Sequence, residues 1–183
     1  MNALLVFVPA LGALFAQAPV MKLDAFSRLR RPIDGGRTLR GRRIFGDNKT
    51  WRGAIVMWTG TFLATLALSA WDPYWDAVPD DVRSAGPLLV GALTGTGLVL
   101  AELPNSFLKR QLGIGPGARR RSPGGMALAI LDQGDFTIGI AVALLPVWTI
   151  PVEMLALGFV VVSCVHLAIS WVGLRIGVRR TAW

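Results

Sequence analysis

The sequence has a single cysteine, Cys164, so an intramolecular disulfide is excluded and a cysteine-ligated metal site is not expected. Charged residues are also scarce, at 16% of the 183-residue chain, whereas hydrophobic residues make up 53%. This composition is too apolar for an ordinary soluble domain and indicates an integral membrane protein. The length predicts one domain, and no internal repeat or low-complexity region subdivides it.

The first apolar run lacks the cationic segment with which a signal peptide begins. No charged residue precedes Lys22, and residues 3–20 are almost continuously apolar. Eighteen residues with a rise of about 1.5 Å each roughly span the hydrocarbon core of a bilayer. We therefore interpret this run as a retained transmembrane helix rather than as a cleaved signal.

Four further apolar runs complete the predicted architecture. The sequence predicts an all-α polytopic integral membrane protein, a single membrane-embedded domain with five transmembrane helices. The predicted spans are residues 3–20, 53–71, 85–103, 126–148 and 152–174. The two longest connections, residues 22–52 and 104–125, are basic loops.

The cations lie almost entirely on one side of this topology. Ten Lys or Arg residues fall in residues 22–52, five in residues 104–125 and three in the C-terminal tail, whereas the other side receives only Arg83. The positive-inside rule then predicts a multi-pass protein of the cytoplasmic (inner) membrane, with the N-terminus outside and both basic loops and the C-terminus in the cytoplasm. The net charge of +8 is spread over short loops without a separate basic domain, which argues against nucleic acid as a partner.

The first basic loop contains a segment in which several kinds of polar side chain occur together, and not basic residues alone. Positive-inside topology and contact with anionic membrane lipids explain arginines such as Arg28, Arg30 and Arg31. They do not explain the run Gly46-Asp47-Asn48-Lys49-Thr50, which combines an acid, an amide, a cation and a hydroxyl. Cations, backbone amides beside glycines and a hydroxyl are the groups that bind a triphosphate, so this run predicts a phosphate-binding loop.

Two acids interrupt the fourth predicted span. Asp132 and Asp135 are three residues apart, so on a helix they project from the same face. Carboxylates at membrane depth must pair with cations or face a wet cavity. The residues leave two readings open: ion pairs with Lys or Arg of the neighbouring loops, or a Mg²⁺ site, for which Glu102 would supply a third oxygen ligand.

Three segments in this order resemble the motifs of the CDP-archaeol synthase family, the CTP:lipid-phosphate cytidylyltransferases of archaeal ether-lipid synthesis. Residues 43–53 resemble its hallmark cytoplasmic loop, residues 105–114 its Ser-Phe-Leu-Lys-Arg segment, and residues 131–136 its Asp-Gln-x-Asp-Phe segment. The last two are also similar to the signature of CDP-diacylglycerol synthases. Glu102 stands where that wider family tends to have aspartate, and residues 118–130 are longer than the archaeal pattern.

The resemblance implies a reaction in which a lipid phosphate attacks the α-phosphorus of CTP, pyrophosphate leaves and a CDP-lipid remains. The lipid would be 2,3-digeranylgeranylglyceryl phosphate or a phosphatidic-acid-like phosphate. On this basis the expected catalytic residues are Asp132, Asp135, Lys109 and Lys49. The expected substrate-binding residues are Asp47, Asn48, Thr50, Arg52, Arg43, Ser106 and Arg110. The expected Mg²⁺ ligands are Asp132, Asp135 and Glu102.

Two other classes of membrane protein are alternatives to this one. A small membrane transporter or lipid-binding scaffold would place carboxylates near the midplane of several spans or use an inverted repeat, whereas here the acids gather at the predicted cytoplasmic end. A CDP-alcohol phosphatidyltransferase would carry an Asp-Gly-x-x-Ala-Arg motif, which this sequence lacks.

Overall fold

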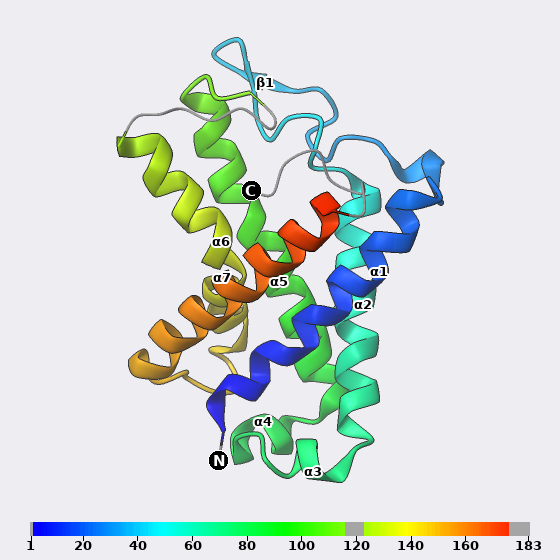
Figure 1. The fold of residues 1–183 in the computed structure, drawn as a ribbon, viewed down its shortest axis with the longest axis vertical. Coiled ribbons are helices and arrows are strands. Elements are labelled where there is room, and N and C mark those ends of the chain that lie inside the picture. The colour runs from blue at the N-terminus through cyan, green and yellow to red at the C-terminus, as the bar shows by residue number, and fades with distance from the viewer. Residues whose placement is uncertain (1, 116–122, 176–183) are drawn as a thin grey trace.

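The chain folds into helices that follow the predicted apolar runs (Figure 1). The structure is a computed structural model, and it describes residues 2–115 and 123–175. The elements in chain order are η1 (Ala3–Ala10), α1 (Leu11–Lys22), η2 (Ser27–Leu29), β1 (Thr38–Leu39), β2 (Arg42–Arg43), α2 (Trp51–Ser69), α3 (Asp72–Trp75), α4 (Asp80–Ala85), α5 (Pro87–Gln111), α6 (Pro123–Leu144) and α7 (Val152–Arg175).

Among the described residues, two helical segments are long and apolar enough to cross a membrane by length and composition. They are Ala3–Lys22 and Pro87–Gln111, and the shorter apolar stretches Gly134–Leu144 and Val152–Val165 lie in α6 and α7. The helical and membrane character predicted from composition is thereby supported, while the number of spans and their orientation stay predictions.

The prediction that a loop begins at residue 104 is wrong, because the helix that contains the third predicted span is longer than that span. Helix α5 continues through Pro104 to Gln111. A proline inside a helix removes a single backbone hydrogen bond, and a long helix packed on both sides tolerates that loss. As a result, Lys109 and Arg110 stand on a helix instead of a loop.

The first basic loop contains a small sheet that the all-α prediction did not include. Strands β1 and β2 pair antiparallel, with Thr38 opposite Arg43 and Leu39 opposite Arg42. The first predicted span also differs in detail, because residues Ala3–Ala10 form a 3-10 helix before the α-helix begins at Leu11. Pro9 contributes to this tighter start, since it has no backbone N–H to donate.

Helix α5 lies at the centre of the bundle and packs against both α2 and α6, while α1 covers α2 and α7 covers α6. The contact between α5 and α6 is a backbone contact. A Cβ atom added at Gly97 would overlap the carbonyl oxygen of Gly139, and the reverse also holds. Glycine at both positions therefore allows the two helices to approach closely, which fixes the spacing of the polar residues farther along them.

The two ends of the bundle carry different connections (Figure 1). The N-terminal segment lies beside the α2–α4 connection, because the amide of Asn2 donates to the Ala77 carbonyl at 2.9 Å and the Tyr74 hydroxyl to the Leu5 carbonyl at 2.8 Å. The β1–β2 hairpin lies at the opposite end, as the predicted topology requires. The basic residues Arg119, Arg120, Arg121, Arg179 and Arg180 lie outside the described residues.

Candidate functional site

The loop before α2 is folded around the buried carboxylate of Asp34. One oxygen of Asp34 accepts from the backbone amide of Gly36 at 3.0 Å and from the guanidinium of Arg43 at 2.6 Å. The other accepts from the amides of Phe45 and Gly46 at 2.9 and 3.0 Å. These four bonds draw residues 34–46 into a compact turn that precedes the predicted phosphate-binding run.

The same bonds set the charge state of Asp34. Burial alone would raise the pKa of this carboxyl, but the hydrogen bonds from Arg43 and from the three backbone amides together hold the pKa well below its usual range. Asp34 is therefore a permanent anion inside a basic loop. Its ion pair with Arg43 extends to Asp47, because Arg43 also donates to the exposed Asp47 carboxylate.

The C-terminal end of α5 is tied to this loop. Arg110 donates from Nε to the Phe45 carbonyl at 3.2 Å, and the amide of Gln111 donates to the Arg43 carbonyl at 3.2 Å. Arg110 also donates to the carbonyl of Ile114. Arg43 and Arg110, both predicted to bind substrate, thus also hold the loop against α5.

The predicted phosphate-binding run leads directly into α2. The Thr50 hydroxyl accepts from the amide of Gly53 at 3.2 Å and so caps the N-terminus of that helix. Lys49, one residue earlier, forms an ion pair with Glu102 of α5, and both side chains are about four-fifths buried, with 22% and 23% exposed. This contact brings two sequence-predicted residues together from positions 53 residues apart.

A second polar cluster joins α5 and α6. The Lys109 amine lies 2.6 Å from the Asp132 carboxylate, and the Asn105 amide donates to the same oxygen at 2.9 Å. Asn105 and Lys109 are four residues apart on α5, so they present one face to α6. Ser106, also predicted to bind substrate, is buried beside Asn105.

Asp135 is the most buried acid of this region, with 8% of its surface exposed. Asp135 follows Asp132 on α6 at a spacing of three residues, so the two carboxylates lie on the same side of that helix. One of the Asp135 oxygens, Oδ1, is buried without a hydrogen-bond partner, as is Oδ1 of Asn105. Buried oxygens of this kind call for a donor or a cation.

This arrangement bears on the Mg²⁺ prediction. Among the described residues, no three or more His, Cys, Asp or Glu side chains are grouped closely enough to hold a metal ion. Glu102 and Asp132 instead each pair with a lysine, which was the other reading left open by the sequence. The unpartnered Asp135 oxygen still fits an oxygen-ligated cation, and the metal site stays a prediction.

A polar pocket of about 500 Å³ lies between the basic loop and the ends of α1, α2 and α5. Six of the predicted site residues line it: Asp47, Asn48, Lys49, Thr50, Arg52 and Glu102. Arg30, which the sequence predicted only as a topology or lipid-contact residue, lines it as well. Its size and cationic wall suit a phosphate-bearing ligand.

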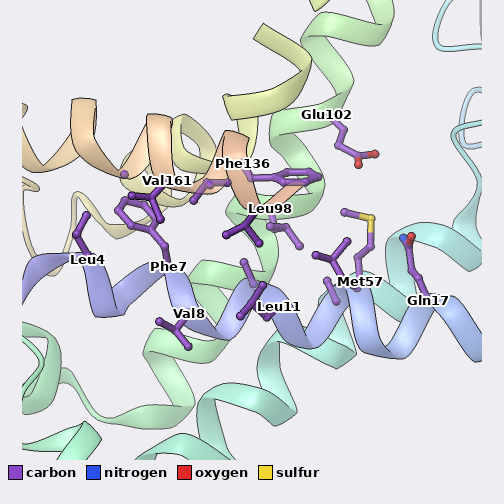
Figure 2. Close-up of a pocket in the computed structure, with 16 residues that line it drawn as sticks. Leu4, Phe7, Val8, Leu11, Gln17, Met57, Leu98, Glu102, Phe136 and Val161 are labelled. Carbon is purple, nitrogen blue, oxygen red and sulfur yellow. The ribbon is translucent and has the colours of Figure 1, made fainter. Parts of the chain in front are cut away.

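An apolar cavity of about 200 Å³ adjoins this pocket inside the bundle. Figure 2 shows apolar side chains such as Leu4, Phe7 and Val161 along it, with Gln17 and Glu102 at one end. Gln17, Met57 and Glu102 line the polar pocket too. The two spaces therefore share a wall at which a polar group and an apolar chain can meet.

Sequence reasoning missed three residues that shape this region: Asp34, Asn105 and Asp24. Asn105 could have been found, because it lies one helical turn before Lys109 once α5 is extended beyond Pro104. Asp34 precedes Gly35-Gly36, a turn signal that suits an aspartate accepting from a nearby amide, yet its long-range partners leave no local pattern.

The fold and the pocket define a helical membrane protein with a cation-rich, carboxylate-containing site at one end of the bundle. Comparison with known proteins specifies the class further. A family model described as CarS-like, CDP-archaeol synthase, matches residues 7–183. Proteins named CDP-archaeol synthase are similar to this chain in Halobacterium salinarum (35% identity over 163 residues, 84% of this chain and 83% of the relative) and in Pyrococcus furiosus (33% over 154 residues, 83% of each).

A solved structure is similar as well, with 27% identity, a TM-score of 0.63, and coverage of 90% of this chain and 89% of the other. It is described as an intramembrane enzyme for archaeal membrane lipid biosynthesis. This chain belongs to the CDP-archaeol synthase family.

Proposed function

We propose that this protein is a CTP:lipid-phosphate cytidylyltransferase, which converts a membrane lipid phosphate into a CDP-lipid and releases pyrophosphate. The observation that carries the proposal is the shared wall of the polar pocket and the apolar cavity at Gln17, Met57 and Glu102. A reaction between a water-soluble nucleotide and a lipid needs such a junction, because one substrate comes from the cytoplasm and the other stays in the bilayer. Membership of the CDP-archaeol synthase family supports the same reaction.

The proposed chemistry is a phosphoryl-type transfer without a covalent enzyme intermediate. An oxygen of the lipid phosphate forms a bond to the α-phosphorus of CTP, and the bond from that phosphorus to the bridging oxygen of the β-phosphate breaks. Pyrophosphate leaves with the bridging oxygen. Because the lipid phosphate is already anionic at neutral pH, no general base is required, and the protein contributes positioning and charge neutralisation.

Residues on three elements would supply these contributions. Lys49, just before α2, and Lys109 on α5 are two of the cations proposed to bind phosphates, and each is paired with a carboxylate. Asn48 and Asp47 line the pocket beside them. Asn105 keeps the Asp132 carboxylate oriented towards Lys109.

Asp132, Asp135 and Glu102 stay the proposed ligands of Mg²⁺. In the described structure these three side chains are not grouped closely enough for one ion, so binding would require Glu102 and Asp132 to leave Lys49 and Lys109. A bound Mg²⁺ would neutralise phosphate charge, since this ion commonly shares its coordination between carboxylates and substrate phosphates. The buried, unpartnered Oδ1 of Asp135 is the observation in this chain that favours such an ion.

The lipid proposed as natural substrate is 2,3-digeranylgeranylglyceryl phosphate, with phosphatidic acid as the alternative of the same headgroup chemistry. In the proposed orientation the hairpin end of the bundle faces the cytoplasm, because the loops at that end carry the cations. CTP would then reach the polar pocket directly.

A labelled-CTP assay on the purified protein tests this function. The protein, with Mg²⁺, is offered digeranylgeranylglyceryl phosphate, phosphatidic acid or a polyprenyl phosphate, and the products are analysed by mass spectrometry. We expect a CDP-lipid and an equal amount of pyrophosphate with a glycerol-based lipid phosphate. Saturable CTP binding without any CDP-lipid from the panel would count against the proposal and favour a non-catalytic lipid-binding scaffold.

A further inference from the structure

Two arginines at the rim of the polar pocket share one carboxylate. Arg52, in the first turn of α2, donates to Oδ1 of Asp24 at 2.6 Å and to the Ala25 carbonyl at 3.1 Å. Arg30 reaches the same Oδ1 at 3.3 Å. Both arginines line the pocket, so a single anionic oxygen already occupies the point at which their guanidinium groups converge.

The Arg52 side chain is only 11% exposed, whereas Asp24 is 52% exposed. Burying most of a charged guanidinium group costs free energy of desolvation unless an anion lies beside it. Asp24 supplies that anion from the more accessible side of the contact, and an incoming anion could replace it without moving Arg52.

The segment that carries Asp24 has an unusual backbone. Asp24 and Phe26 have φ angles of 45° and 54°, in the left-handed region. Aspartate enters this region several-fold more often than most residues, but for a bulky residue such as phenylalanine the conformation is a strained one. The bonds from Arg52 to Asp24 and Ala25 are the contacts that tie this turn to α2.

The same segment has the character of a membrane-interface element. Leu23 and Phe26 are exposed at 76% and 63%, and the basic residues Arg28 and Arg30 follow them within the same short segment. Exposed apolar side chains beside cations are typical of chain that lies at the level of the lipid headgroups. The paired arginines therefore lie where the phosphate of a membrane lipid would be found.

We propose that Arg30 and Arg52 form the binding site for the phosphomonoester of the lipid substrate, and that Asp24 occupies this site until the substrate displaces it. The inference rests on the proposed function and adds that these two arginines bind the phosphate of the lipid and not a phosphate of CTP. Guanidinium groups suit this task, because their planar donors bind two oxygens of one phosphate.

The alternative occupant is a phosphate of CTP, and the position of the pair argues against it. Lys49 and Glu102 lie against the α5 wall of the pocket, whereas Arg30 and Asp24 belong to the interfacial segment that follows α1. Val20 and Met21 at the end of α1 line the pocket on that side, which gives the arginine pair an apolar neighbour suited to a lipid and not to a nucleotide.

Steady-state kinetics on three variants test the assignment. Arg30→Gln should raise KM for the lipid phosphate at least fivefold while KM for CTP stays within twofold of wild type. Asp24→Asn keeps an acceptor and tolerates the left-handed backbone, but removes the competing charge, so it should lower KM for the lipid. Arg28→Gln is the matched control, an equal charge change on the same segment away from the pocket, and should change neither constant.

A binding measurement separates this proposal from the proposed function. Tryptophan fluorescence, with Trp51 next to Arg52 as the natural reporter, is titrated with a short-chain phosphatidic acid, with the matching diacylglycerol and with CTP. Phosphatidic acid binding that Arg30→Gln weakens supports the site even if no CDP-lipid is ever formed. The assignment is overturned if Arg30→Gln behaves like Arg28→Gln, or if it weakens CTP at least as much as the lipid phosphate.

Discussion

Replacing Asp34 by asparagine should loosen the loop that precedes the predicted phosphate-binding run. The Asp34 side chain is fully buried and accepts four hydrogen bonds, two on each oxygen. Asparagine keeps one acceptor oxygen, but its NH₂ group then faces two donors. Two bonds to a charged acceptor are lost, each worth about 1.5–3 kcal/mol, so the local opening free energy should fall by about 3 kcal/mol or more.

Hydrogen exchange is the assay closest to this loss, because the amides of Phe45 and Gly46 donate to Asp34 directly. A decrease of about 3 kcal/mol corresponds to at least a hundredfold faster exchange where these amides exchange by local opening. Asp47→Asn is the matched control. It removes the same charge and contacts the same Arg43, but its side chain is 70% exposed, so the change should be at most about 1 kcal/mol.

The dependence on pH follows from the lowered pKa of Asp34. The stabilisation that Asp34 gives to the loop should be complete at pH values above the pKa of an aspartate in the unfolded chain, about 3.9. It should be lost as the pH falls from there towards the lower pKa of Asp34 in the folded loop. Protection corrected for intrinsic exchange should therefore be level between pH 5 and 7 and should decline below pH 4. Exchange at Phe45 and Gly46 within threefold of wild type in Asp34→Asn would refute the role given to this carboxylate.

Two other substitutions probe how the site is held. Lys49→Gln leaves Glu102 largely buried without its cation and should lower the free energy of unfolding by about 1–3 kcal/mol, measured by thermal unfolding followed by circular dichroism. The double variant Lys49→Gln/Glu102→Gln should recover most of that loss. Equal melting temperatures of the single and double variants would contradict a stabilising pair. Gly97→Ala places a Cβ against the Gly139 carbonyl, which cannot move aside, and should cost about 1–3 kcal/mol. Gly53→Ala meets only the Thr50 hydroxyl at 3.5 Å and should melt near wild type, so matching losses in both glycine variants would argue against the close α5–α6 contact.

The helices were predictable because hydrophobicity is a local property of the sequence. The predicted fifth span, residues 152–174, and α7 (Val152–Arg175) coincide almost residue for residue. Helix α5 was underestimated because a proline at the edge of an apolar run indicates a helix end, and sequence alone does not show that packing against α2 and α6 carries the helix past Pro104.

The site was predictable in its residue types but not in its pairings. Spacing places Asp132 and Asp135 on one helix face, yet it does not say which cation lies opposite, and Lys109 comes from a segment expected to be a loop. The Arg52 contact with Asp24 joins residues 28 apart, across an irregular turn. Asp34 depends in the same way on amides 11 and 12 residues further along. Such contacts arise from tertiary folding and leave no periodic trace in the sequence.

The transfer of CMP from labelled CTP to a lipid phosphate, compared between wild type and Asp135→Asn, tests the central claim most directly. Asparagine is nearly isosteric and removes only the charge at a buried oxygen that has no hydrogen-bond partner in the described structure. We predict at least a hundredfold lower CDP-lipid formation and pyrophosphate release, with helical content and membrane insertion unchanged. CDP-lipid formation near the wild-type rate in this variant would contradict an active centre built on the α6 carboxylates.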